Sequence, residues 1–180
     1  MHDFAESLAA SHSASDLPIW EEIYRASFLG FSTMVDHRQD GEHQRAGIDR
    51  SVILENSKQI LIDEKVRWRN AITGKVYDDI ALEYWSNQER KVPGWVCKPL
   101  RADYIAYAIA PLGKCYLLPV MQLQLAWDRC GEYWIEQFHS VKAKNNGYTT
   151  VSVGVPVADV FREIGGALRA RFQPVEAAHA

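Results

Sequence analysis

The chain has 180 residues, of which 47% are hydrophobic, and a formal net charge of −3. This length supports one globular domain with its own core, and the slightly acidic balance excludes a broadly basic nucleic-acid coat. Three cysteines without C-x-x-C spacing argue against a disulfide framework or a zinc knuckle, so we expect a reducing, cytoplasmic environment.

No stretch of the sequence is apolar over the thickness of a bilayer. The most apolar run, 104–110, is far too short for a spanning helix. The N-terminal residues lack the basic segment followed by an apolar run that is typical of a secretory signal. We therefore expect no membrane partner.

Composition predicts three segments along the chain. Residues 1–15 are rich in Ala, Ser and His and are expected to form a flexible N-terminal segment. Residues 16–173 are expected to form a single domain, and residues 174–180 a loose tail.

The domain opens with a helix, because Trp20, Ile23, Tyr24, Phe28 and Phe31 follow helical spacing. The polar stretch 36–44 then reads as a loop, whose His43 and Gln44 lie closest to the next element.

Two strands with a short turn between them, 46–54 and 58–67, form the central feature of the sequence. Side chains two apart in a strand share a face, so Asp63 and Lys65 point the same way and Glu64 points opposite. Asp49 shares a face with Ser51 in the first strand. An antiparallel pairing of the two strands could set Asp49 beside Asp63 and Lys65.

Two carboxylates and a lysine on one sheet face are costly unless something binds there. The carboxylates repel each other, and their removal from water adds to the cost. A divalent cation resolves the conflict, because Mg²⁺ takes oxygen ligands from one or two carboxylates and from substrate phosphate. The plain alternative is two solvated strand faces with an ordinary cross-strand salt bridge.

Further strands and helices are predicted after this pair. Residues 78–86 read as a third strand, on which Glu83 could join the acidic face, although an edge-strand carboxylate is the alternative. Strands are expected at 103–110, 114–120 and 149–155. The clearest helix runs from 122 to 138 with a core stripe that includes Trp127, and a closing helix is expected from 157 to 172.

Two basic clusters are candidates for contacts with a nucleic-acid backbone. Arg67, Arg69 and Lys75 follow the second strand, and the alternative for them is a solvated hairpin tip. The other cluster is Lys142, Lys144 and Asn145, in a basic, flexible stretch that ends in the turn-forming Asn146-Gly147 pair.

The pattern Ile48-Asp49, followed after a turn by Asp63-Glu64-Lys65, resembles the PD-(D/E)XK nuclease superfamily. The resemblance assigns Asp49 to the first metal-binding position, Asp63 to the (D/E) and Lys65 to the K. Glu64 is the variable residue, expected to offer its backbone carbonyl to the metal. The sequence departs from the pattern at Ile48, where the superfamily's name places a proline.

The resemblance implies a fold and an activity. The fold is α/β, with a central mixed β-sheet flanked by helices in a restriction-endonuclease-like αβββαβ core. The activity is metal-dependent hydrolysis of DNA with Mg²⁺, for which Mn²⁺ can substitute, and Glu83 would assist. The implied partners are DNA and a homodimer or a larger complex with a partner protein, in a phage, mobile-element, defence or repair setting. The alternative is a non-catalytic DNA-binding or protein-interaction subunit with the same fold.

Overall fold

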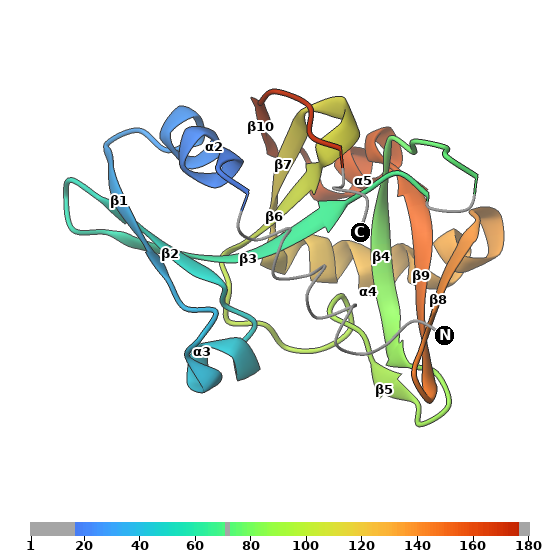
Figure 1. Ribbon diagram of the computed structural model, residues 1–180. Coiled ribbons are helices and arrows are strands. Elements are labelled where there is room, and N and C mark those ends of the chain that lie inside the picture. Colours follow the sequence, from blue (N-terminus) through green and yellow to red (C-terminus); the bar gives the residue numbers. More distant parts are fainter. Residues whose placement is uncertain (1–16, 71–72, 177–180) are drawn as a thin grey trace. The chain divides into compact units, whose positions relative to one another are not determined.

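The computed structural model describes residues 17–70 and 73–176, which divide into two compact units (Figure 1). We call them the larger-sheet unit, with described residues 17–70, 73–78, 100–120 and 167–176, and the smaller-sheet unit, with residues 79–99 and 121–166. The sequence predicts a single domain over 16–173, whereas the contacts separate two interleaved units. The N-terminal segment 1–15 and the tail residues 177–180 lie outside the described residues.

The larger-sheet unit contains a mixed sheet of six strands in the order β1-β2-β3-β6-β7-β10. The strands are β1 (Phe31–Asp36), β2 (Arg50–Leu54), β3 (Gln59–Arg67), β6 (Tyr104–Ile109), β7 (Lys114–Pro119) and β10 (Leu168–Arg171). β3 and β6 run parallel, and every other neighbouring pair is antiparallel. A mixed sheet with helices confirms the general α/β class.

Helix α2 (Ile19–Ser27) buries its apolar side in the core of this unit. Trp20, Ile23 and Tyr24 are almost fully buried and belong to one cluster with Val52 and Ile62 of the sheet. The helix is shorter than its spacing predicts. Phe28 follows its end, and Phe31 opens β1, a strand that the sequence analysis did not predict. The unit also holds the short helix α3 (Gly41–Arg45) and the 3₁₀ turn η1 (Ala110–Leu112).

The smaller-sheet unit has an antiparallel sheet of four strands in the order β5-β4-β9-β8. The strands are β5 (Val92–Pro93), β4 (Asp79–Asn87), β9 (Tyr148–Pro156) and β8 (Ser140–Asn145). Helix α5 (Val157–Ile164) follows β9, and nearly all of α4 (Val120–Gln137) belongs to this unit. Asn146-Gly147 forms the tight turn between β8 and β9, with Gly147 at φ 82°, so the stretch predicted as flexible is mostly a paired strand.

The prediction that 78–86 forms the third strand beside the central pair is wrong. These residues form β4, which pairs with β5 and β9, while β3 pairs with β2 and β6. Ile80 and Leu82 of β4 lie opposite Val155 and Val153 of β9, and all four are buried. Alternation along the sequence therefore identified the strand but not its partner.

The predicted closing helix is also too long. α5 ends at Ile164, and Gly165 and Gly166 follow with φ values of 78° and 128°. These left-handed conformations suit glycine, terminate the helix and lead the chain into β10. The first residues of the predicted loose tail are held in place. The Val175 N–H donates to the Ala110 carbonyl over 3.0 Å, and Glu176 pairs with Arg69.

The packing of α4 distinguishes its two central tryptophans. Trp134 is 2% exposed, whereas Trp127 is only partly buried. We expect Trp134→Ala to lower the free energy of unfolding by about 3–5 kcal/mol, as large core truncations do, and Trp127→Ala to cost less. Chemical denaturation measures both. Tyr133→Ala, an exposed aromatic on the same helix, is the control and should change stability by about 0.5 kcal/mol or less.

Candidate active site

Asp49 lies immediately before β2, and hydrogen bonds hold both its backbone and its carboxylate. Its backbone N–H donates to the Ile62 carbonyl over 2.8 Å, which extends the β2–β3 pairing by one residue. Its carboxylate accepts the Glu64 N–H over 2.8 Å and the Gln44 side-chain amide over 2.9 Å. Gln44, noted in the sequence as a residue close to this strand, is thus a direct partner of Asp49.

Asp63 and Lys65 lie on the same face of β3, as the alternation predicts. The Asp63 side chain is almost fully buried, and the Lys65 ammonium forms an ion pair with it. The Lys65 ammonium also lies 3.4 Å from the Glu64 carbonyl oxygen. Asp63 and Asp49 are close enough for each to shift the pKa of the other. The structure therefore brings together Asp49, Asp63 and Lys65.

The two carboxyl groups differ in their affinity for a proton. Burial raises the pKa of Asp63 to about 6, because the attraction of Lys65 only partly offsets burial and the repulsion of Asp49. Burial also disfavours the charge of Asp49. There, however, Lys65 and the hydrogen bonds from Gln44 and Glu64 outweigh it, and the pKa of Asp49 is lowered. The donor set fits a hard divalent cation, which would relieve the repulsion between the two carboxylates.

The Glu64 side chain points to the opposite face of β3, toward α2. Its Oε1 accepts hydrogen bonds from the Tyr24 hydroxyl over 2.7 Å and from Arg50 Nε over 2.6 Å. Burial raises the pKa of Glu64 to about 7 despite the attraction of Arg50. The Glu64 side chain is therefore buried on the other side of the sheet, and its backbone N–H and carbonyl lie on the side of Asp49 and Lys65.

The predicted basic cluster beside this site is only partly available to a ligand. Arg67 continues the face of Asp63 and Lys65, and its guanidinium lies 5.4 Å from the centre of the Tyr77 ring. Lys75 lies over the same ring at 4.7 Å. Arg69 is neutralised by Glu176 and also donates to the Gly74 carbonyl over 2.9 Å.

Four other predicted site residues belong to the smaller-sheet unit. Glu83 lies on β4, in a different sheet from Asp49 and Asp63, so it is not part of a continuous acidic sheet face with them. Lys142 and Lys144 are exposed and lie on the same face of the edge strand β8. Asn145 ends that strand and donates its side-chain amide to the Thr150 hydroxyl over 3.1 Å.

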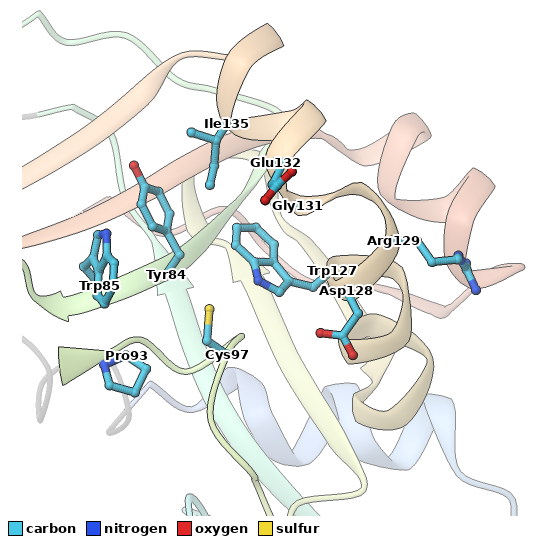
Figure 2. Close-up of a pocket in the computed structure, with 10 residues that line it drawn as sticks. All are labelled: Tyr84, Trp85, Pro93, Cys97, Trp127, Asp128, Arg129, Gly131, Glu132 and Ile135. Carbon is cyan, nitrogen blue, oxygen red and sulfur yellow. The ribbon is translucent and has the colours of Figure 1, made fainter. Parts of the chain in front are cut away.

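The smaller-sheet unit also contains a pocket of about 420 Å³, which the sequence analysis missed (Figure 2). Figure 2 shows the side chains of Tyr84 and Trp127 near each other in its lining, and their ring centres lie 6.0 Å apart in a stacked arrangement. Asp128 and Glu132 add carboxylates to the lining. Desolvation raises the pKa of the Cys97 thiol despite a hydrogen bond from Trp127, so Cys97 is not an activated nucleophile.

Comparisons with protein-family models, with curated proteins and with solved structures find no match to this chain. Within residues 17–70 and 73–176, no helix combines the length and the hydropathy that a span of the bilayer requires. All three cysteines are free thiols.

The raised pKa of Glu64 predicts a pH dependence of stability. Because its pKa rises from 4.5 to about 7 on folding, its contribution to stability is fully present below about pH 4.5 and is lost as pH rises toward 7. Glu64→Gln should therefore flatten the decline in unfolding free energy across this range. Denaturant unfolding at several pH values measures the slope. Glu55→Gln, at an exposed position, should leave the slope unchanged, and an unchanged slope in Glu64→Gln would contradict the assignment.

Proposed function

We propose that this protein is a metal-dependent nuclease that hydrolyses DNA phosphodiester bonds. The observation that carries the proposal is the convergence of Asp49, Asp63 and Lys65 on one face of the β2–β3 pair, with Asp63 buried. A buried pair of like charges beside a lysine is unfavourable in a purely structural role, and such arrangements concentrate at functional sites.

The topology of the larger-sheet unit supports a restriction-endonuclease-like core. Helix α2 precedes three antiparallel strands, β1, β2 and β3, and β6 then joins β3 in parallel. These elements fit the αβββ part of an αβββαβ core, with Asp49 immediately before the second strand. The chain departs from the pattern between β3 and β6, where the described residues contribute β4 and β5 to the other sheet in place of a helix.

Each residue of the proposed site has a distinct role. Asp49, Asp63 and the Glu64 carbonyl would hold Mg²⁺ or Mn²⁺, and the ion would lower the pKa of a bound water and polarise the phosphate. Gln44 and the Glu64 N–H orient the Asp49 carboxylate. Lys65, in contact with Asp63 and near the Glu64 carbonyl, would orient the attacking water and offset charge that develops on the phosphate.

The alternative is a non-catalytic DNA-binding or protein-interaction subunit. The observation that favours it is the weakness of the positive surface beside the acidic pair. The chain carries a net charge of −3, and Arg69, one of the three predicted basic contacts there, is paired with Glu176. Such a protein would draw its affinity for DNA from a homodimer or from a partner protein.

Cleavage of DNA tests the proposal. We expect the parent chain to cleave at least one of linear duplex, single-stranded, circular and branched DNA in Mg²⁺ or Mn²⁺. Asp49→Asn, Asp63→Asn and Lys65→Ala should each lower the rate by about a hundredfold or more, because each removes charge needed in the transition state. Lys58→Ala, an exposed lysine on the same hairpin, is the matched control and should cleave like the parent.

Two results would count against this assignment. Full activity in Lys65→Ala or Asp63→Asn would show that the site is misplaced. If the parent cleaves none of the substrates and Mn²⁺ binding is unchanged in Asp49→Asn, the non-catalytic subunit becomes the better explanation.

The exposed lysines of β8 give a separate prediction about DNA affinity. We expect Lys142→Ala/Lys144→Ala to weaken binding uniformly across sequences and to reduce the slope of log affinity against log salt by about 2, one for each lost phosphate contact. Fluorescence anisotropy with a labelled duplex, in Ca²⁺ to limit cleavage, measures both quantities. Lys98→Ala, at another exposed position in the same unit, is the control. An unchanged salt slope would remove β8 from the DNA contact surface.

A further inference from the structure

Three potential metal ligands converge in the segment that precedes Asp49. His37 follows β1, Asp40 precedes α3, and His43 lies within α3. One ligand atom from each of these three residues lies within 4.8 Å of the other two. The imidazole rings of His37 and His43 are stacked, with centres 4.0 Å apart and planes within 5° of parallel. Both rings are partly accessible, and Asp40 is exposed, so an ion can reach all three.

The surrounding contacts orient these side chains. Asp40 Oδ1 accepts the backbone N–H groups of Glu42 and His43, which fixes the carboxylate as the cap of α3. Its second oxygen, Oδ2, lies 2.9 Å from His43 Nδ1 and is the oxygen available to a metal. His37 Nε2 lies 2.7 Å from the Ser51 hydroxyl of β2, which leaves Nδ1 as its ligand atom. The sheet therefore orients His37, and the cap of the short helix orients Asp40.

We propose that His37, Asp40 and His43 bind a transition-metal ion of the zinc class, at a site separate from the one formed by Asp49 and Asp63. Two imidazoles and one carboxylate are a donor set suited to Zn²⁺, Co²⁺ or Ni²⁺, whereas Mg²⁺ prefers oxygen ligands alone. Three protein ligands leave at least one position for water or a further ligand.

Binding of one ion by all three residues requires rotation of the His43 ring. A metal lies in the plane of each imidazole that it binds, so two parallel stacked rings cannot both direct a lone pair at one ion. Because the His43 side chain is 34% exposed, its ring can rotate out of the stack without disturbing the core. Asp40 Oδ2 then exchanges its contact with His43 Nδ1 for the metal.

An ion at this position would also affect Asp49, because the residues around it contact Asp49. The His37 N–H donates to the Asp49 carbonyl over 2.8 Å, and Gln44, next to His43 in α3, donates to the Asp49 carboxylate over 2.9 Å. An ion bound by His37, Asp40 and His43 would therefore restrain residues 37–44, the segment that positions Asp49. The inference stands without the nuclease proposal, because it concerns binding by different side chains.

Direct binding tests the inference. Chelator-treated full-length protein is titrated with Zn²⁺ by calorimetry and with Co²⁺ by visible absorption. We expect one ion per chain, with affinity lowered about tenfold or more in His37→Ala, His43→Ala and Asp40→Asn. Asp40→Asn is the most specific variant, because asparagine retains the oxygen that caps α3 and removes only the negative charge of the ligand. Glu42→Gln, an exposed carboxylate in the same helix, is the matched control and should bind like the parent.

A second pair of variants distinguishes the proposed transition-metal site from the acidic pair. Asp49→Asn and Asp63→Asn should retain Zn²⁺ binding, and thermal unfolding of both should still shift upward on addition of Zn²⁺. Loss of Zn²⁺ binding in correctly folded Asp63→Asn would instead assign the ion to the acidic pair. No binding by the parent, or equal binding by the parent and Asp40→Asn, would overturn the inference. A failure of DNA cleavage leaves this result unaffected.

Discussion

The antiparallel pairing of β2 with β3 is the constraint on which the candidate site depends. Glu64 is buried against Tyr24 and Arg50, on the face of β3 that α2 covers. Because neighbouring side chains in a strand point to opposite faces, this contact forces Asp63 and Lys65 onto the other face. A register slip of one residue would bring Asp63 and Lys65 into the core and take Glu64 out of it.

Three consecutive charged residues in one strand carry a considerable electrostatic cost. The cost is reduced on both faces, by Arg50 beside Glu64 and by Lys65 beside Asp63. Compensation is incomplete, since burial still raises the pKa of Asp63 to about 6 and that of Glu64 to about 7. Sequences tolerate such local conflict chiefly where function requires it, so the face of Asp63 and Lys65 is a candidate site.

Asp49 is contacted both by the loop between β1 and β2 and by strand β3. Asp49 is positioned by Gln44 of the five-residue helix α3 and by the backbone of Glu64. The same short segment carries His37 and His43, so one loop between β1 and β2 contributes to both the acidic pair and the proposed transition-metal site. The local structure around Asp49 is therefore set by capping and side-chain hydrogen bonds as much as by the sheet.

Features that depend on neighbours in the chain could be read from the sequence. The turn at 55–57, the opposite faces of Asp63 and Glu64, and the turn at Asn146-Gly147 all follow from alternation and turn chemistry. The helix boundary at Gly165 was missed, because a helical spacing of apolar residues continued past the glycines that end α5.

Other features depend on which distant segments pair, and only the tertiary structure decided them. β3 takes β6 as its parallel neighbour, and β4, with Glu83, joins a separate sheet with β9. The sequence by itself determined that Asp49, Asp63 and Lys65 could share a face, because that property is local to one hairpin. It could not determine the partner of β4, because backbone hydrogen bonding is available to any strand and packing in the folded chain selects among the alternatives.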